Sequence, residues 1–210
     1  SIHLSNKAAD RLLNSLGWSR KSIQETMNRS REPLNFEIEG YQLKANINLN
    51  ITESRAANVV GIIKSGNRKY RDEYIVIGAH FDHIGYGGAG SGSRSLKENT
   101  IHPGANDNAS GTAGLLELAQ KLSANKGRLK RSVLLVGFDA EEKGLLGSKY
   151  FVEKPTLPLM QIKTMINMDM IGRVKDSVVN IGGVGTSPVF RPLIDSLRFI
   201  HPLKLTLSDA

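Results

Sequence analysis

Apolar runs and amphipathic segments set the expected structure of most of the chain. The run 132–138 is apolar on both faces, which is typical of a buried central strand that is parallel to its neighbours. Residues 58–63 and 73–79 predict two further strands, and 165–171 another buried one. Residues 112–122 carry a broad apolar face and predict a helix packed on the sheet. Shorter elements are expected later in the chain: strands at 178–182 and 203–207, and a helix from Ser187-Pro188 to about Phe199.

The amino-terminal part has a different pattern. Residues 5–16 predict a capped amphipathic helix that ends at a glycine, and residues 21–29 predict a weaker helix. From 36 to 51, apolar and polar positions alternate, which predicts antiparallel or edge strands with one face in solvent. We therefore expect an amino-terminal helix and hairpin segment at 1–52 and a main α/β domain at 53–210.

Composition excludes several classes of function. At 40% hydrophobic and 23% charged residues, the chain has ordinary soluble composition. The net charge of +8 would suit nucleic acid, but the basic residues are scattered with few aromatics among them, so we expect no nucleic-acid partner. No apolar run approaches the roughly 20 residues that cross a bilayer, so we expect no membrane partner. The absence of cysteine excludes disulfides, cysteine-type zinc sites and thiol nucleophiles.

Ionisable side chains recur where the predicted elements begin or end. His80 and Asp169 lie at strand ends, Asp107 precedes a helix, and Glu141 and Glu142 follow the central strand. Because the carboxyl ends of parallel strands meet at one edge of a sheet, we expect these side chains in one crevice. Singly, each would more often be a helix cap, an ion-pair partner or a structural histidine. Together, so many carboxylates need a counter-charge, which divalent cations supply. Imidazole and carboxylate ligands suit zinc, with manganese or cobalt as alternatives.

Neighbouring positions indicate a division of roles. Glu141 and Glu142 point in different directions, and a metal ligand beside a general base is one plausible division. Asp107 has two oxygens and can bridge two ions about 3.5–4 Å apart. Asp82 is suited to accept the second N–H of the His80 imidazole. The remaining histidines are read as structural or surface residues: His3, His83, His102 and His201.

These residues lie in four motifs that resemble the co-catalytic di-zinc aminopeptidases, whose wider kin include glutamate carboxypeptidases and glutaminyl cyclases. The motifs are Ala79-His-Phe-Asp-His83, Pro103-Gly-Ala-Asn-Asp-Asn-Ala-Ser-Gly111, Phe138-Asp-Ala-Glu-Glu-Lys-Gly-Leu-Leu-Gly-Ser148 and Asn167-Met-Asp-Met-Ile-Gly-Arg173. The resemblance implies the zinc-exopeptidase fold, an α/β three-layer sandwich with a mixed, mostly parallel central sheet and helices on both faces. It covers about residues 58–173. Residues 2–51 are similar to the region that flanks a protease-associated insert in longer members.

The resemblance also implies a zinc-dependent aminopeptidase that acts on a peptide substrate, carries two Zn²⁺ per chain and is secreted or periplasmic. His80 and Asp169 would hold one zinc, Glu142 the other and Asp107 both, with Glu141 as general base on a water and Asp82 behind the histidine ligand.

The family takes one more histidine ligand from a loop well downstream of a Ser-Asp that matches Ser208-Asp209, and His201 lies outside any matching motif. We therefore expect either a fragment or a second metal site with one protein ligand fewer.

Three other functions are weighed against this one. A related carboxypeptidase or glutaminyl cyclase would use the same metals. A non-catalytic, receptor-like relative is expected to have lost ligands, whereas all five matched positions are present. Gly85-Tyr-Gly-Gly-Ala-Gly90 satisfies the nucleotide-binding pattern Gly-x-Gly-x-x-Gly, but that pattern must open a helix directly after its strand, and Ser91-Gly-Ser-Arg-Ser95 follows instead. We expect residues 85–106 to form a loop beside the cleft.

Overall fold

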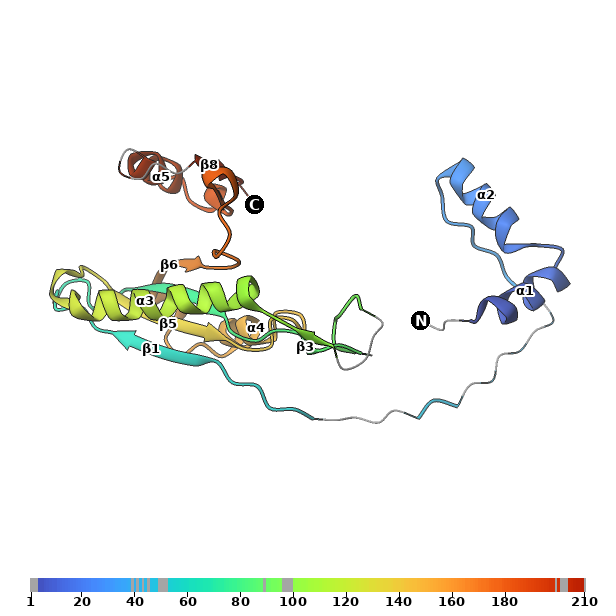
Figure 1. Cartoon of the computed structure of the whole chain (residues 1–210), viewed down its shortest axis with the longest axis horizontal. Helices are drawn as coiled ribbons and strands as arrows, with labels where there is room; N and C mark the ends of the chain where they lie inside the picture. Colours follow the sequence, from blue (N-terminus) through green and yellow to red (C-terminus); the bar gives the residue numbers. More distant parts are fainter. Residues whose placement is uncertain are drawn as a thin grey trace. The chain divides into compact units, whose positions relative to one another are not determined.

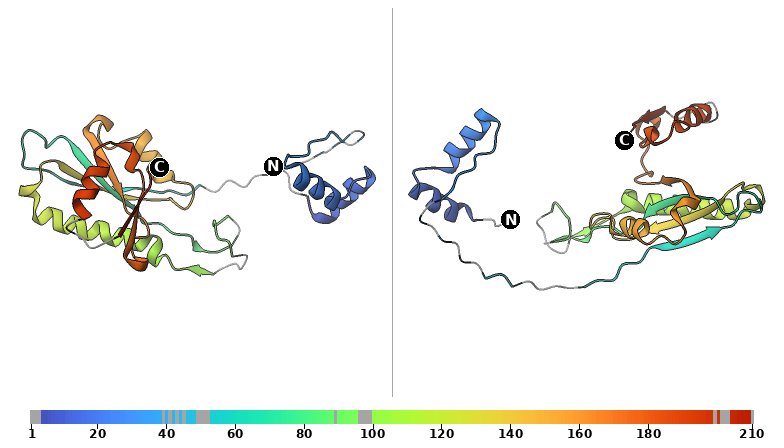
Figure 2. Two further views of the ribbon diagram at one scale, coloured as in Figure 1. Left: turned by 90° about the horizontal axis from the view of Figure 1, so that it is seen from above. Right: turned by 180° about the vertical axis from the view of Figure 1, so that it is seen from behind.

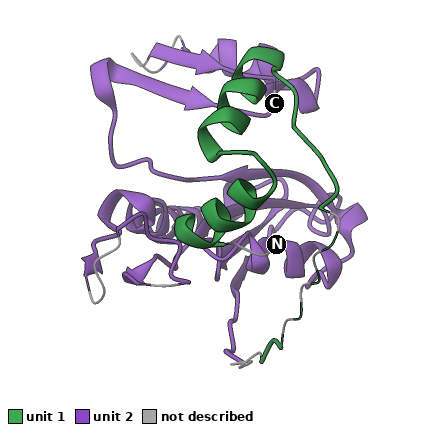
Figure 3. Ribbon diagram, turned by 90° about the vertical axis from the view of Figure 1, so that its right-hand side faces the viewer, with its two compact units in different colours: residues 1–52 green, residues 53–210 purple. Residues whose placement is uncertain are grey.

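The computed structural model describes residues 4–38, 40, 42, 44, 46–48, 53–88, 90–95, 100–198, 200 and 204–209. The chain divides into two compact units, residues 1–52 and 53–210 (Figure 3). Within the described ranges, no helix has both the length and the apolar character needed to cross a membrane.

The first unit contains the two predicted helices, α1 (Asn6–Ser15) and α2 (Arg20–Ser30). The Arg20 guanidinium joins them, because its Nε donates to Asp10 Oδ1 at 2.5 Å. The described residues of the range 36–51 form no strand, and the other residues of that range lie outside the part of the chain that the structure describes. Alternation alone gives a segment two faces, but a strand also needs a neighbour for its backbone N–H and C=O groups.

The second unit is built on a four-stranded sheet in the order β1-β5-β2-β6 (Figure 1). β5 (Ser132–Phe138) lies between β1 (Val59–Ile63), which is antiparallel to it, and β2 (Tyr74–His80), which is parallel. β6 (Ile162–Asn167) continues the sheet parallel to β2. The predicted mixed, mostly parallel sheet and the buried central position of 132–138 are therefore confirmed.

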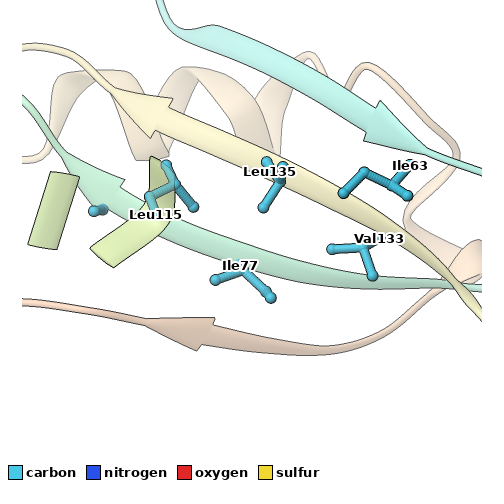
Figure 4. Packing of buried hydrophobic residues seen from close by; sticks show 6 residues of the cluster. Ile63, Ile77, Leu115, Val133 and Leu135 are labelled. Carbon is cyan, nitrogen blue, oxygen red and sulfur yellow. The ribbon is translucent and has the colours of Figure 1, made fainter. Parts of the chain in front are cut away.

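Alternate side chains of β5 pack against different helices. Val133 and Leu135 belong to the apolar cluster that includes Leu115 of α3 (Ser110–Ala124), as Figure 4 shows. Leu134 and Val136 belong to a second cluster with Phe151 of α4 (Leu146–Glu153). Because successive residues of a strand point to opposite faces of the sheet, α3 and α4 cover opposite faces. This is the predicted three-layer arrangement.

The strand predicted at 165–171 differs from the observed β6 in two ways. β6 ends at Asn167, and Met165 and Ile166 are 44% and 54% exposed rather than buried. The reason is position, because β6 is the last strand of the described sheet and has a neighbour on one side only. Asp169 therefore lies two residues beyond the strand.

Short elements complete the second unit. The expected loop at 85–106 contains a small antiparallel pair, β3 (Gly85–Tyr86) and β4 (Ile101–His102). β7 (Val178–Ile181) and β8 (Lys204–Leu207) form a separate parallel pair, and α5 (Phe190–Arg198) lies between them in sequence (orange and red in Figure 2). Single 3₁₀ turns occur at Lys126–Arg128, Leu159–Gln161, Lys175–Ser177 and Val184–Thr186.

Candidate metal centre

Three of the predicted ligands meet at the end of β2. His80 is the last residue of that strand, and its side chain is only 4% exposed. Its Nε2 lies 3.2 Å from Asp107 Oδ1 and 3.7 Å from Asp169 Oδ1. These three residues each offer one ligand atom, and the atoms lie within 4.8 Å of one another. The structure thus brings together a nitrogen and two carboxylate oxygens, as the sequence predicts.

Strand register explains why His80 and Asp169 lie side by side. Gly78 of β2 is level with Asn167 of β6 in the parallel ladder. The backbone N–H of Met168 donates to the Gly78 carbonyl at 2.9 Å, and His80 and Asp169 follow directly beyond this last pairing. Asp107 reaches the same point from the short segment Ala105–Ala109, whose backbone is not helical at Asp107 and which leads directly into α3.

The hydrogen bonding of the His80 ring suits a metal ligand. Its Nδ1 lies 3.2 Å from the backbone carbonyl oxygen of Asp82. A carbonyl can only accept, so Nδ1 carries the hydrogen and Nε2 presents its lone pair towards Asp107 and Asp169. A hydrogen bond from the other ring nitrogen is the usual way in which proteins orient a ligating imidazole.

Asp82 makes different contacts from those predicted for it. Its carboxylate Oδ1 is 3.6 Å from His80 Nδ1, further than the backbone oxygen of the same residue. The carboxylate instead accepts two backbone N–H groups, from Glu141 at 2.9 Å and from Glu142 at 3.1 Å. Asp82 therefore fixes the turn that carries both glutamates, and its carbonyl orients the histidine.

Glu141 borders the first group of ligands without belonging to it. Its Oε2 lies 3.9 Å from His80 Nε2, and it lines a cavity of about 220 Å³ together with His80 and Asp169. Burial raises the pKa of the Glu141 carboxyl, while nearby His80 lowers it and the surrounding carboxylates raise it further. A larger cavity, about 440 Å³, lies beside β1 and α4 and is lined by none of the predicted site residues.

A second group of ligand atoms contains Glu142. Its Oε1 lies 2.8 Å from His83 Nδ1, and both residues offer atoms within 4.8 Å of an Asp107 oxygen. The two groups thus share Asp107. His83 was expected to be structural, and the structure places it here instead.

The residues fit divalent cations in both charge and donor type. Among the described residues, the ion pairs of Asp82, Asp107, Glu141, Glu142 and Asp169 involve only histidines, with no lysine or arginine. Buried carboxylates without a balancing charge are costly. In addition, His83 Nδ1 and Glu142 Oε1 are buried and make no hydrogen bond. A cation in contact with these atoms would satisfy both.

Asn108 ties the two aspartate loops together, a role that the sequence reasoning missed. Its side chain is 1% exposed, and its Nδ2 donates to the carbonyl of Met168 at 3.0 Å. Its Oδ1 accepts from the backbone N–H of Met170 at 3.1 Å and of Gly111 at 3.0 Å. Asn108 directly follows Asp107 in the sequence, and it hydrogen-bonds the residues on both sides of Asp169. The sequence feature that could have indicated this role is the position of Asn108 directly after Asp107.

We expect Asn108→Ala to destabilise the unit by about 3 kcal/mol and to weaken metal binding, because one buried and two partly buried backbone groups lose their partner. Urea unfolding and metal analysis would measure both effects. Asn125→Ala is the matched control, since that amide bonds one exposed helix carbonyl. Equal stability of the two variants would contradict the role of Asn108.

With this geometry established, comparison with known proteins gives the family. The chain belongs to peptidase family M28, whose model matches residues 58–205. The family that the four motifs indicated is therefore confirmed. The match begins next to β1 and includes all the site residues described above.

Three curated relatives show the range of activities in this family. Aminopeptidase YwaD of Bacillus subtilis (strain 168) is 32% identical over 122 residues, which cover 58% of this chain and 23% of that protein. A glutamate carboxypeptidase 2 homolog of Caenorhabditis briggsae is 33% identical over 140 residues, 64% of this chain and 16% of that protein. Leucine aminopeptidase 2 of Trichophyton equinum is 31% identical over 134 residues, which cover 61% of this chain and 23% of that protein. The chain spans about a quarter or less of the length of these relatives.

Solved structures share the fold. A zinc aminopeptidase from Bacillus subtilis superimposes with a TM-score of 0.52 at 28% identity, covering 71% of this chain and 34% of that one. A glutaminyl cyclase of an Acidobacteriales bacterium gives a TM-score of 0.52 at 21% identity, and the superposition covers 73% of this chain and 51% of that one. At that lower identity the likeness concerns the fold alone.

Proposed function

We propose that residues 53–210 carry the catalytic centre of a metal-dependent aminopeptidase, which removes amino-terminal residues from peptides. The observation that carries the proposal is the pair of ligand groups that share Asp107, with Glu141 beside them in a cavity. Membership of peptidase family M28 and the names of two relatives, both aminopeptidases, support it. The cavity of about 220 Å³ places Glu141 beside two of the proposed ligands, His80 and Asp169.

Zinc is the proposed metal, with two ions per chain. The first would be held by His80, Asp107 and Asp169, and the second by Asp107 and Glu142. Bound divalent ions would supply Lewis acidity at the scissile carbonyl and lower the pKa of the attacking water.

The remaining chemistry belongs to the protein's own side chains. The Glu141 carboxylate takes the proton from the attacking water and then passes it to the departing amine. Asp82 keeps Glu141 in place through the backbone N–H that it accepts.

A carboxypeptidase or a glutaminyl cyclase is the second candidate, because the relatives and structural neighbours include both. The three reactions would use the same metal ligands, so the ligand set does not distinguish them. Assays with different substrates are needed to do so. We expect the purified protein to hydrolyse aminoacyl anilides to the amino acid and the free aniline, to lose this activity on chelation and to regain it with Zn²⁺.

Two matched substrates make that experiment specific. An acetylated aminoacyl anilide should resist cleavage, because an aminopeptidase requires the free amino group. Cyclisation of an amino-terminal glutamine peptide, or release of a carboxyl-terminal glutamate, without aminoacyl anilide cleavage would replace the proposal with its alternative. No turnover of any substrate by the zinc-loaded protein would favour a non-catalytic relative.

A further inference from the structure

We propose that Asn58 is a positioning residue for the turn that carries Glu141 and Glu142, although it belongs to neither ligand group. The turn runs from Asp139, directly after β5, to Gly147 in the first turn of α4. The proposal rests on the proposed function for its effect on turnover. Its effect on the turn itself does not depend on which reaction is catalysed.

A single side-chain amide joins the two ends of this turn. Asn58 Oδ1 accepts the backbone N–H of Asp139 at 3.1 Å, and Asn58 Nδ2 donates to the carbonyl of Gly147 at 2.8 Å. The ends are also bonded to each other, because the Gly147 N–H donates to the Asp139 carbonyl at 3.0 Å. Asn58 therefore closes the base of the turn from a segment that lies 81 residues away from Asp139 in the sequence.

The three residues at the base of the turn pack without room for another side chain. A Cβ at Gly147 would lie 2.4 Å from Asn58 Oδ1 and 2.2 Å from the Asp139 carbonyl oxygen. Both distances are shorter than non-bonded atoms allow, so a side chain at this position would displace the amide or the turn. Glycine is thus needed here for the close approach of the backbone to Asn58.

The backbone directly before the two glutamates is strained. Ala140 has a φ of 54°, in the left-handed region that favours glycine. Such a conformation persists when the surrounding bonds hold it in place. The Asp139 carboxylate provides two of them, because Oδ1 accepts the Ala140 N–H at 2.8 Å and Oδ2 accepts the Ala57 N–H at 2.9 Å. Asn58 and its neighbour Ala57 thus hold the turn against relaxation of this residue.

The other side of the turn is held by Asp82, which accepts the backbone N–H groups of Glu141 and Glu142. With both sides held, the points from which the two glutamate side chains extend are fixed. The competing interpretation is that Asn58 only anchors β1, which begins at the next residue, Val59. The two interpretations differ in which backbone amides become exposed when Asn58 is replaced.

Hydrogen exchange of the metal-free full chain separates them. In Asn58→Ala, the amides of 139–147 should exchange at least about 10-fold faster, because two hydrogen bonds no longer oppose local opening, while those of β2 keep their rates. Asn125→Ala is the matched control, since its amide bonds one exposed helix carbonyl, and it should leave the turn unchanged. Faster exchange confined to β1, or equally faster exchange throughout the unit, would refute the positioning role.

Turnover of an aminoacyl anilide, at Zn²⁺ concentrations that saturate each variant, measures the consequence for the reaction. Asn58→Ala should lower kcat about 10–100-fold and leave KM nearly unchanged, because a misplacement of about 1 Å costs rate rather than substrate binding. Adding Ala140→Gly should restore most of the lost kcat, since glycine adopts a positive φ without strain. Arg31→Gly, which relieves a φ of 58° at the end of α2, is the second-site control and should restore nothing.

Two kinetic results would overturn the proposal: an unchanged kcat in Asn58→Ala, or no recovery when Ala140→Gly is added. Thermal unfolding of the metal-free variants checks the fold. If Asn58→Ala does not fold, Asn58→Asp replaces it, because aspartate has nearly the same shape but cannot donate to Gly147.

Failure of this proposal is separable from failure of the proposed function. If the unaltered protein cleaves no aminoacyl anilide, the aminopeptidase is refuted, and hydrogen exchange still decides whether Asn58 holds the turn. Cleavage by the unaltered protein, together with unchanged exchange of 139–147 in Asn58→Ala, would refute the role of Asn58 alone.

Discussion

Replacing Glu141 with glutamine should lower kcat by about 10²–10⁴-fold, the usual share of general acid–base catalysis, while metal content stays unchanged. The amide has nearly the shape of the carboxylate but cannot accept the proton from water. Glu141 offers no atom to either ligand group, so its charge is not needed to hold a cation. Steady-state kinetics on an aminoacyl anilide, with metal analysis of the same sample, would measure both quantities.

Glu153→Gln provides the matched control for this variant, because Glu153 ends α4 on the exposed surface. It should leave kcat and metal content as they are. A Glu141→Gln protein with full turnover would remove Glu141 from the role of base. Loss of a metal ion from the Glu141→Gln protein would instead indicate that Glu141 is a metal ligand.

The core of the second unit could be predicted from sequence because its central strands are apolar on both faces. β5 and β2 lie between other strands and under helices, so nearly every side chain in them is buried. Such runs also fix where the strands end. Once three parallel strands are expected, their carboxyl ends must share an edge, and the approximate position of the site follows.

The edges of the sheet and the first unit were less predictable. β1 and β6 lie at the two edges, and several of their apolar residues are exposed. Whether a strand is central or at an edge depends on its neighbours rather than on its own residues. The alternating stretch 36–51 shows the same limit, because its described residues form no ladder despite a clear period of two.

At the site, residue types were easier to predict than hydrogen-bond partners. His80, Asp107, Glu142 and Asp169 came from strand ends and motifs. The contacts of Asn108 and Asp82 join segments that are about 60 residues apart, and no local pattern contains them. His83 is a related case, because its distance from Glu142 depends on how two turns pack.

Replacing Asp107 with asparagine should abolish tight binding of both ions at once. Asp107 is the one residue common to the two ligand groups, and the change removes the negative charge that each group shares. Asp169→Asn removes a carboxylate from the His80 group only, so it should cost one equivalent and leave the other. Metal analysis after dialysis against a weak chelator would separate the two results, and Asp195→Asn, on the surface of α5, is the charge-matched control.

The contrast between these variants tests the shared ligand itself rather than the general need for acidic residues. If two independent sites happened to lie close together, Asp107→Asn would lose one ion, as Asp169→Asn does. Loss of both ions from Asp107→Asn, and of one from Asp169→Asn, requires a carboxylate that serves two cations. Such an arrangement would also explain why, among the described residues, several acids gather at the ends of β2, β5 and β6 without lysine or arginine partners, because two divalent charges would balance them.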